Sequence, residues 1–317
     1  MVQSNSANAI NTLAGLLVVI TGPTGVGKTQ LCTELALAFG SPVLSADSRQ
    51  MYREMKIGTA VPSREQLGKV KHYFIGNLSV VDYYNASKFE MEAIGLLNKL
   101  FRETTVVFMS GGSGLYVDAV CNGIDDLPPA DADIRNYISQ KYKTSGMSWL
   151  RDELKNLDPD HYDTIDLNNP KRILKALEIC YITGQPYSSF LTGKKKDRDF
   201  KIIKIGLNID REELYEIINR RVDEMIGGGL VEEVKSLTGF RHLNALNTVG
   251  YKELFEYLDG KISLDRATDL IKRNSRRYAK RQLTWLAKDN DVIWFKPGDY
   301  GPIYDLISRN LCNSQIS

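Results

Sequence analysis

The sequence predicts an α/β protein: a parallel sheet core with helices on both faces, and a helical insertion. Three observations lead to this prediction. Short apolar runs, typical of strands buried on both faces, alternate with longer segments whose apolar residues recur at helical spacing. The first apolar run, 16–20, leads directly into a glycine-rich loop and then a helix. The stretch 122–200 contains helical patterns and no strand pattern.

The glycine-rich loop at 22–29 reads GPTGVGKT and fits the phosphate-loop pattern G-x-x-x-x-G-K-[ST]. It consists of Gly22, Pro23, Thr24, Gly25, Val26, Gly27, Lys28 and Thr29. Glycines let successive backbone N–H groups face an anion, and the helix that follows adds the positive end of its dipole. Lys28 supplies a cation, and the Thr29 hydroxyl is a candidate Mg²⁺ ligand. Because a chance match is rare, the pattern predicts a phosphate site on a P-loop core.

Polar residues also follow the strands expected at 42–45 and 105–109. Asp47 comes after the first, and Ser113 follows two glycines after the second. In open α/β sheets, ligands bind at this carboxyl edge of the strands. Two alternatives stay open: Asp47 as a turn or helix cap, and the glycines as a plain tight turn. The 105–109 strand ends without the acidic residue that ATPases place there, which weakens the hypothesis of nucleotide hydrolysis.

A change in pattern at residue 122 gives the domain organisation. Asp158-Pro159 and Asn169-Pro170 mark helix starts within the following stretch. The expected parts are 14–121, the first part of the P-loop core; 122–200, the helical insertion; and 201–317, the second part of the core. In the last part we expect strands at 202–209 and 292–295, and helices at 211–226 and 263–288.

The helix expected at 263–288 is basic. Leu264, Ile271, Tyr278 and Trp285 recur every seven residues and predict one apolar seam. The cations on other faces are Arg273, Arg276, Arg277, Lys280 and Arg281. Acidic partners at i,i+4 spacing are scarce. Two interpretations remain: a contact surface for nucleic-acid phosphates, or a solvated basic face.

Composition limits the remaining function classes. The chain has 317 residues and a net charge of only +2, so any nucleic-acid surface must be a local patch. Its four cysteines lie far apart without a C-x-x-C pair, which predicts a reducing compartment and no zinc module. No apolar stretch is long enough to span a membrane, and the first dozen residues lack a signal-peptide pattern. We therefore expect a cytoplasmic protein.

Together these motifs resemble the tRNA dimethylallyltransferase (tRNA isopentenyltransferase) family over nearly the whole chain. The matching segments are GPTGVGKT (22–29), DSRQMY (47–52), IGTAVPS (57–63), GGSGLY (111–116), LPPADADIR (127–135), NPKRILKALE (169–178), NTVGYKEL (247–254) and RRYAKRQLTWL (276–286). DSRQMY, GGSGLY and AKRQLTWL in that order separate this family from nucleotide kinases. The sequence has no C-terminal zinc-finger extension of the kind seen in eukaryotic members, and so resembles the bacterial type.

The resemblance implies transfer of a dimethylallyl group from dimethylallyl diphosphate to N6 of the adenosine 3′-adjacent to the anticodon in tRNA, with release of diphosphate. It implies that Asp47 is the general base, that Thr24 and Arg221 bind the diphosphate with the P-loop, and that Mg²⁺ binds at Thr29. The residues that it implies contact the tRNA are Asp47, Ser48, Arg49, Gln50, Ser113, Arg135, Lys171, Arg172, Lys175, Arg277, Lys280 and Arg281. The implied partner is the tRNA anticodon arm, with neither a membrane nor an obligate protein partner.

Two departures from the family pattern stand out. Ser113 replaces the threonine of many members but keeps the hydroxyl, and 71–76 (KHYFIG) replaces a more usual His-His-Leu-Ile-Asp run. Two rival hypotheses share the phosphate loop. A P-loop nucleotide or nucleoside kinase predicts ATP binding and leaves DSRQMY without a role. A P-loop nucleic-acid-binding regulator needs neither Asp47 nor an allylic donor.

Overall fold

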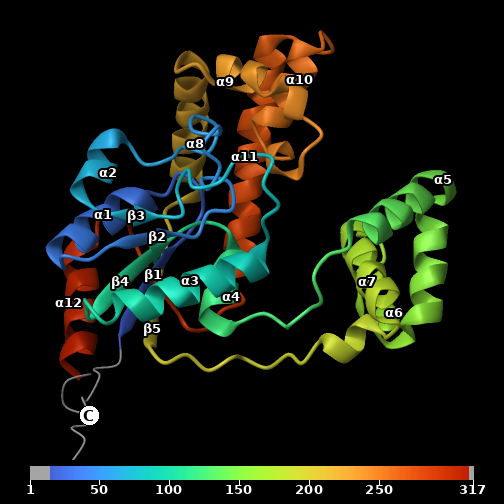
Figure 1. The fold of residues 1–317 in the computed structure, drawn as a ribbon. Helices are drawn as coiled ribbons and strands as arrows, with labels where there is room; N and C mark the ends of the chain where they lie inside the picture. The colour runs from blue at the N-terminus through green and yellow to red at the C-terminus, as the bar shows by residue number, and fades with distance from the viewer. Residues whose placement is uncertain (1–14, 314–317) are drawn as a thin grey trace, which may run out of the picture. The chain divides into compact units, whose positions relative to one another are not determined.

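A six-stranded parallel sheet organises the larger part of the protein in the computed structural model, which describes residues 15–313 (Figure 1). Its strands are β1 (Leu16–Thr21), β2 (Val43–Ser45), β3 (His72–Tyr73), β4 (Val106–Ser110), β5 (Lys201–Leu207) and β6 (Val292–Phe295), in the order β3-β2-β4-β1-β5-β6. Every neighbouring pair is parallel. The predicted α/β class is therefore confirmed, and all six strands end at one edge.

Helices cover both faces of this sheet. The helices of this larger part, including those that lie beyond the edge of the sheet, are α1 (Lys28–Ala38), α2 (Arg64–Lys69), α3 (Ala86–Leu100), α4 (Gly114–Asn122), α8 (Arg211–Gly227), α9 (Leu230–Ser236), α10 (Tyr251–Leu258), α11 (Leu264–Leu286) and α12 (Tyr300–Asn313). Leu16 and Val18 of β1 pack in one apolar cluster with residues of α1 and α12. Leu17 and Val19 point to the opposite face, because side chains alternate along a strand, and they are buried too.

A second apolar cluster lies beyond the carboxyl edge of the sheet. There α8 to α11 pack around the segment after β2, with Tyr52, Val222, Leu230, Tyr251 and Ile271 among the buried residues. In Figure 1, α8 and α11 rise from the sheet, and α9 and α10 lie at their far ends. This arrangement lets one cluster of helices form a wall next to the strand ends.

Residues Asn122–Lys196 form a separate compact unit. Its helices are α5 (Ala132–Leu157), α6 (Pro159–Thr164) and α7 (Pro170–Thr183), and within this unit no strand occurs. Gly146, with φ +72°, interrupts α5 and divides it into two helical segments. The fully buried Asp158 carboxylate caps α6 by accepting from the His161 N–H, at 3.0 Å, and also accepts from the Ser188 hydroxyl. The unit therefore has its own hydrophobic core. Its helix α6 is held by the hydrogen bonds of a buried carboxylate.

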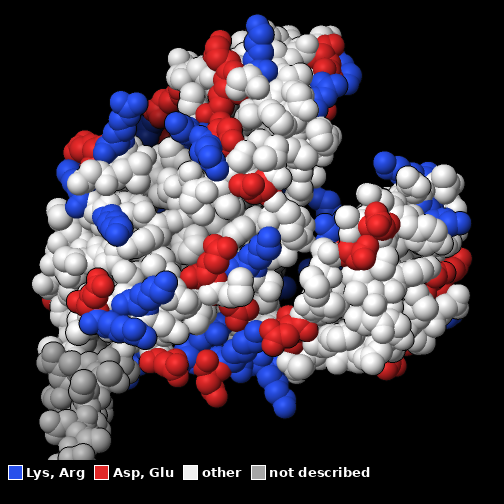
Figure 2. Space-filling view, viewed as in Figure 1, with Lys and Arg blue, Asp and Glu red and all other residues white. Residues whose placement is uncertain are grey.

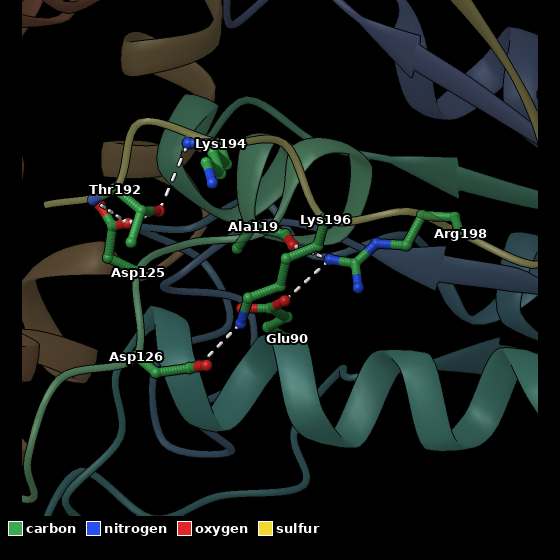
Figure 3. A network of polar contacts seen from close by, with 8 residues as sticks. All are labelled: Glu90, Ala119, Asp125, Asp126, Thr192, Lys194, Lys196 and Arg198. Carbon is green, nitrogen blue, oxygen red and sulfur yellow. Dashed lines mark hydrogen bonds and ion pairs between the residues drawn. The ribbon is translucent and has the colours of Figure 1, made fainter. Parts of the chain in front are cut away.

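The two chain segments at the border of this unit are fixed by polar contacts (Figure 3). On the sheet side, Arg198 donates to Glu90 and to the Ala119 carbonyl, each at 2.8 Å. Within the helical unit, the Asp125 carboxylate accepts from the Thr192 backbone N–H at 2.9 Å and from its hydroxyl at 2.7 Å. Each unit therefore holds its own end of the connection.

Several short elements were not predicted: β3, α2, α4, α9 and α10. No helix was predicted in the tail, yet residues 300–313 form α12. Its Ile303 and Ile307 are buried in the sheet cluster. None of the helices within residues 15–313 has the length and apolar character that a membrane crossing requires.

Candidate active site

The P-loop (residues 22–29) curls around the Lys28 side chain at the carboxyl edge of β1. The Lys28 ammonium donates to the carbonyls of Gly22, at 2.9 Å, and Pro23, at 2.8 Å. Gly27 sits before α1 in the left-handed conformation, with φ +96°, which an L side chain rarely adopts. The loop therefore has the backbone shape that the phosphate-loop pattern predicts.

Asp47 follows β2 and lies in the same cleft as the P-loop. Its Oδ1 accepts from the backbone N–H of Arg49 at 2.9 Å and of Gln50 at 3.3 Å, which fixes the carboxylate in a short turn. The cleft has a volume of about 500 Å³, and Lys28 and Thr29 line it together with Asp47. The fold thus brings together the residues that the sequence placed at two strand ends.

Arg221 reaches this cleft from α8. Its Nη1 donates to the Thr24 hydroxyl at 3.3 Å. Burial lowers the pKa of Lys28 from 10.5 to about 7; the Asp47 carboxylate opposes this shift and Arg221 adds to it. Burial also lowers the pKa of Arg221, again opposed by Asp47. Two desolvated cations therefore share one carboxylate, and an anion in the cleft stabilises both of them.

Gln282 is a site residue to which the sequence analysis gave no role. From α11, its side-chain oxygen accepts from the Thr24 backbone N–H and its amide nitrogen donates to the Gly112 carbonyl, both at 2.8 Å. A Cβ at Gly112 would lie 2.2 Å from that nitrogen, so the two loops approach Gln282 closely. In the sequence, the one available indication was a glutamine within the segment AKRQLTWL that carries the family resemblance.

Ser113 joins the loops after β4 and β2. Its hydroxyl accepts from the Ser48 backbone N–H at 2.9 Å and donates to the Ser48 hydroxyl at 3.1 Å. Tyr278 of α11 lines the cleft beside Asp47. Burial, together with the Asp47 carboxylate, raises the pKa of Tyr278 to about 12, so this phenol stays neutral at physiological pH.

The apolar seam predicted on α11 is wrong at its C-terminal end. Ile271 is buried, but Trp285 is 41% exposed and its indole N–H donates to Asp118 at 3.0 Å. The buried residues of α11 are Ala267, Ile271, Ala279, Gln282 and Leu286. A straight helix drifts by about 20° per heptad relative to a seven-residue repeat, so the buried stripe leaves the predicted seam within a few turns.

The cations of α11 fall into two groups. Arg276 donates to Asn219 at 2.5 Å and lies over the Tyr215 ring, so it belongs to the packing of α8 against α11. The exposed cations are Arg273, Arg277, Lys280 and Arg281. On the face shown in Figure 2, positive and negative side chains are interspersed, as expected for a net charge of +2. The exposed face of α11 is therefore a local basic patch.

Four of the predicted tRNA-contacting residues belong to the helical unit, not to the cleft. Arg135 pairs with the buried Glu178 carboxylate at 2.8 Å, and Lys175 lies 3.8 Å from the same carboxylate. Lys171 and Arg172 are exposed on the first turn of α7. Arg135 and Lys175 therefore have a structural partner, whereas the other two form part of the unit's surface.

An apolar cavity of about 120 Å³ adjoins the cleft that Lys28, Thr29 and Asp47 line, called here the anionic-ligand cleft. Its apolar lining consists of Ile218, Val222, Met225, Leu230, Val249 and Ile271. The residues that line both spaces are Thr24, Asp47, Thr59, Arg221 and Tyr278. The geometry therefore suits a ligand with an anionic head and a short apolar tail, joined close to a carboxylate.

Comparison with known proteins gives a consistent result. The family model described as IPP transferase matches residues 50–289. The chain is 55% identical over 281 residues to tRNA dimethylallyltransferase 1 of Bacteroides thetaiotaomicron, covering 89% of this chain and 91% of that protein. It is 51% identical over 295 residues to tRNA dimethylallyltransferase 2 of Parabacteroides distasonis, covering 93% and 99%. The crystal structure of the tRNA isopentenylpyrophosphate transferase from Bacillus halodurans is similar, with a TM-score of 0.69, 36% identity, and coverage of 94% and 97%.

Proposed function

The chain belongs to the IPP transferase family, and on this premise we propose that it transfers a dimethylallyl group from dimethylallyl diphosphate to N6 of the adenosine 3′-adjacent to the anticodon in tRNA. One observation carries the proposal: the anionic-ligand cleft and the apolar cavity meet at Asp47, Thr24 and Arg221. A diphosphate ester of a five-carbon alkene has a matching head and tail. The relatives support transfer and not the kinase alternative.

The proposal is tested by incubating the protein with dimethylallyl diphosphate, Mg²⁺ and unmodified tRNA, without any nucleoside triphosphate. Nucleoside analysis of the tRNA should then contain N6-dimethylallyladenosine, in an amount equal to the diphosphate released. A strict requirement for ATP, or a phosphorylated product, would instead support the kinase.

Departure of the leaving group is the step that the P-loop assists. As the allylic C–O bond breaks, negative charge grows on the bridging oxygen. Lys28, Arg221 and the P-loop residues Gly25, Gly27 and Thr29 line the cleft where the diphosphate would lie. Groups that are already oriented toward developing charge stabilise it without reorganising, and an arginine adds paired hydrogen bonds.

Asp47 would accept the proton from N6 as the new C–N bond forms. The exocyclic nitrogen is a poor nucleophile, because its lone pair is conjugated into the purine ring, so a positioned base assists it. The N–H groups of Arg49 and Gln50 hold the Asp47 carboxylate in one orientation. The adenine must leave its stack to reach this cleft, as in other enzymes that act on a base.

Magnesium fits the donor set near Thr29. Thr29 is in the first turn of α1 and lines the cleft with Lys28 and Arg221. Within residues 15–313, no cluster of three or more histidine, cysteine or acidic residues is arranged to hold a metal alone, so diphosphate oxygens would be the other ligands. When bound, the ion would neutralise charge on the leaving group.

Two basic surfaces would hold the anticodon arm. One is the exposed face of α11, with Arg277, Lys280 and Arg281. The other is the first turn of α7 in the helical unit, with Lys171 and Arg172. Phosphate contacts of this kind position a nucleic acid without reading its bases. Because the acceptor is tRNA, we also place the reaction in the cytoplasm.

A further inference from the structure

We propose that Glu233 is a specificity-determining residue that sets the length of the prenyl group the enzyme accepts. This inference rests on the proposed function. Glu233 lies on α9, and its carboxylate binds residues 56–58 and Tyr251, which belong neither to the P-loop nor to the turn at Asp47. Its effect would pass through the loop formed by residues 56–60, called here the 56–60 loop.

The Glu233 carboxylate holds the start of this loop by three consecutive backbone N–H groups. Oε2 accepts from Lys56 at 2.8 Å and from Ile57 at 2.7 Å, and Oε1 accepts from Gly58 at 3.0 Å. Oε1 also accepts from the Tyr251 hydroxyl at 2.6 Å. A carboxylate has about four acceptor positions, so these hydrogen bonds occupy the whole acceptor capacity of Glu233, which acts as a clamp on the loop.

The loop depends on this clamp because its own conformation is tight. Ala60 has φ +49°, which is uncommon for a residue with a side chain. Gly58 packs flat against the buried Tyr251 ring, since a Cβ there would lie 2.6 Å from a ring carbon. Burial and the Glu233 carboxylate raise the pKa of Tyr251, so its hydroxyl remains a donor. Strained segments of this kind persist only where their surroundings hold them.

The clamped loop is a wall of the apolar cavity. Gly58 and Thr59 line the cavity together with Leu230 and Val249. The same loop also contacts Gln50, whose side-chain amide donates to the carbonyls of Thr59, at 3.2 Å, and Ala60, at 3.0 Å. The loop is therefore held from two sides: by Glu233 on α9, and by Gln50 next to Asp47.

The position of the clamp gives it a role in length selection. The clamped residue Gly58 lines the cavity together with Leu230 of α9, and neither residue lines the P-loop cleft, whereas Thr59 lines both spaces. The clamp therefore holds a part of the cavity wall that does not face the P-loop cleft. A cavity of about 120 Å³ takes a short branched chain. A hydrophobic pocket rejects a longer tail strongly only if its wall does not yield. Releasing the wall would admit a longer donor.

The test compares two donors in the full-length enzyme. In Glu233→Gln, the amide NH₂ faces N–H and O–H donors, and the clamp loses about half of its hydrogen bonds. We expect the ratio of kcat/KM for dimethylallyl over geranyl diphosphate, with tRNA as acceptor, to fall about tenfold. This ratio does not depend on the fraction of folded enzyme, so a merely structural loss would leave it unchanged. Affinity for inorganic pyrophosphate should stay at the wild-type value.

Two further variants make the test decisive. Glu232→Gln, an exposed neighbour on α9, should keep the wild-type ratio. Tyr251→Phe keeps the ring and removes one hydrogen-bond donor to Glu233, so it should shift the ratio in the same direction by a smaller factor. If Glu233→Gln does not fold, Tyr251→Phe provides the test. If the Glu233 and Tyr251 variants fold, bind pyrophosphate normally and keep the wild-type ratio of kcat/KM for the two donors, the proposed role of the clamp is wrong. Failure of the wild-type enzyme to alkylate tRNA would instead overturn the proposed function.

Discussion

Gln282 of α11 accepts a hydrogen bond from the backbone N–H of Thr24 at 2.8 Å, across 258 positions of the sequence. Its amide nitrogen donates to Gly112 at the same distance. One side chain thus joins the P-loop, the loop after β4 and the helix that carries the basic patch. The contact matters because it fixes Thr24, whose hydroxyl accepts from Arg221.

Replacing Gln282 by alanine should therefore weaken donor binding more than tRNA binding. Without the side chain, the Thr24 N–H and the Gly112 carbonyl lose their partners, which costs about 1–3 kcal/mol for each buried group. We expect KM for dimethylallyl diphosphate to rise about tenfold and the melting temperature to fall. Steady-state kinetics and thermal unfolding measure both. Thr284→Ala, an exposed change on the same helix, is the control, and an equal effect of the two variants would contradict this role.

The local parts of the fold could be predicted because their causes are local. The strand and loop at 16–29 and the strands that became β4 and β6 follow from short apolar runs and punctuating residues. β3 could not be predicted, since it has only two residues and gains its place by pairing with β2. The tail that forms α12 gains its order from packing against α1 and the sheet. Such tertiary causes leave a weak trace in the sequence.

The candidate site divides in the same way. Lys28 and Asp47 stand out in the sequence because their residue types fit the chemistry, Arg221 was indicated only by the family resemblance, and the structure brings all three to one cleft. Gln282 and Glu233 act through contacts with backbone groups that are far away along the chain. Nothing in a single sequence indicates which backbone N–H a distant carboxylate or amide will meet.

The pKa of Lys28 predicts proton uptake on donor binding. In the free enzyme this pKa is lowered from 10.5 to about 7, so at pH 8 the neutral form of the side chain predominates. A bound anion favours the charged form and raises the pKa again. Binding of pyrophosphate should therefore take up a proton at pH 8, and affinity should fall as the pH rises above 7.

Calorimetry at pH 8 in buffers with different ionisation enthalpies measures this uptake. Because pyrophosphate has proton equilibria of its own, the comparison is with Lys28→Arg, which stays charged and should take up about one proton fewer. Equal uptake by the two proteins would show that Lys28 is already protonated in the free enzyme.

The basic patch on α11 predicts a change in the salt dependence of tRNA binding. If Arg277 and Lys280 each contact a phosphate, the double change Arg277→Gln, Lys280→Gln should reduce the slope of log K against log salt by about two. Titrations of tRNA at several salt concentrations give this slope. Pyrophosphate affinity should not change. Lys235→Gln, an exposed lysine on α9, is the control, and an unaltered slope in the double variant would mean that α11 presents only a solvated face.

Asp47→Asn tests the residue proposed as the base. The asparagine keeps the oxygen that accepts from Arg49 and Gln50, so the turn after β2 should persist. It does not usefully accept the N6 proton, and a general base typically contributes about 10²–10⁴-fold, so kcat should fall by that order. Pyrophosphate affinity should hold or increase slightly, because a negative charge beside the anion site is removed.

The same variant separates the other two roles open to Asp47. If the carboxylate is a magnesium ligand, raised Mg²⁺ should restore part of the rate. If it is only a turn cap, Asp47→Asn should keep both its stability and most of its activity, because asparagine caps a turn about as well as aspartate, whereas Asp47→Ala should lose about 1 kcal/mol of stability. If it is the base, kcat should stay low when Mg²⁺ is raised, although the melting temperature of the variant is normal. Measuring kcat, pyrophosphate affinity and melting temperature together therefore decides the role, and a kcat near the wild-type value at saturating tRNA would remove Asp47 from the chemical step.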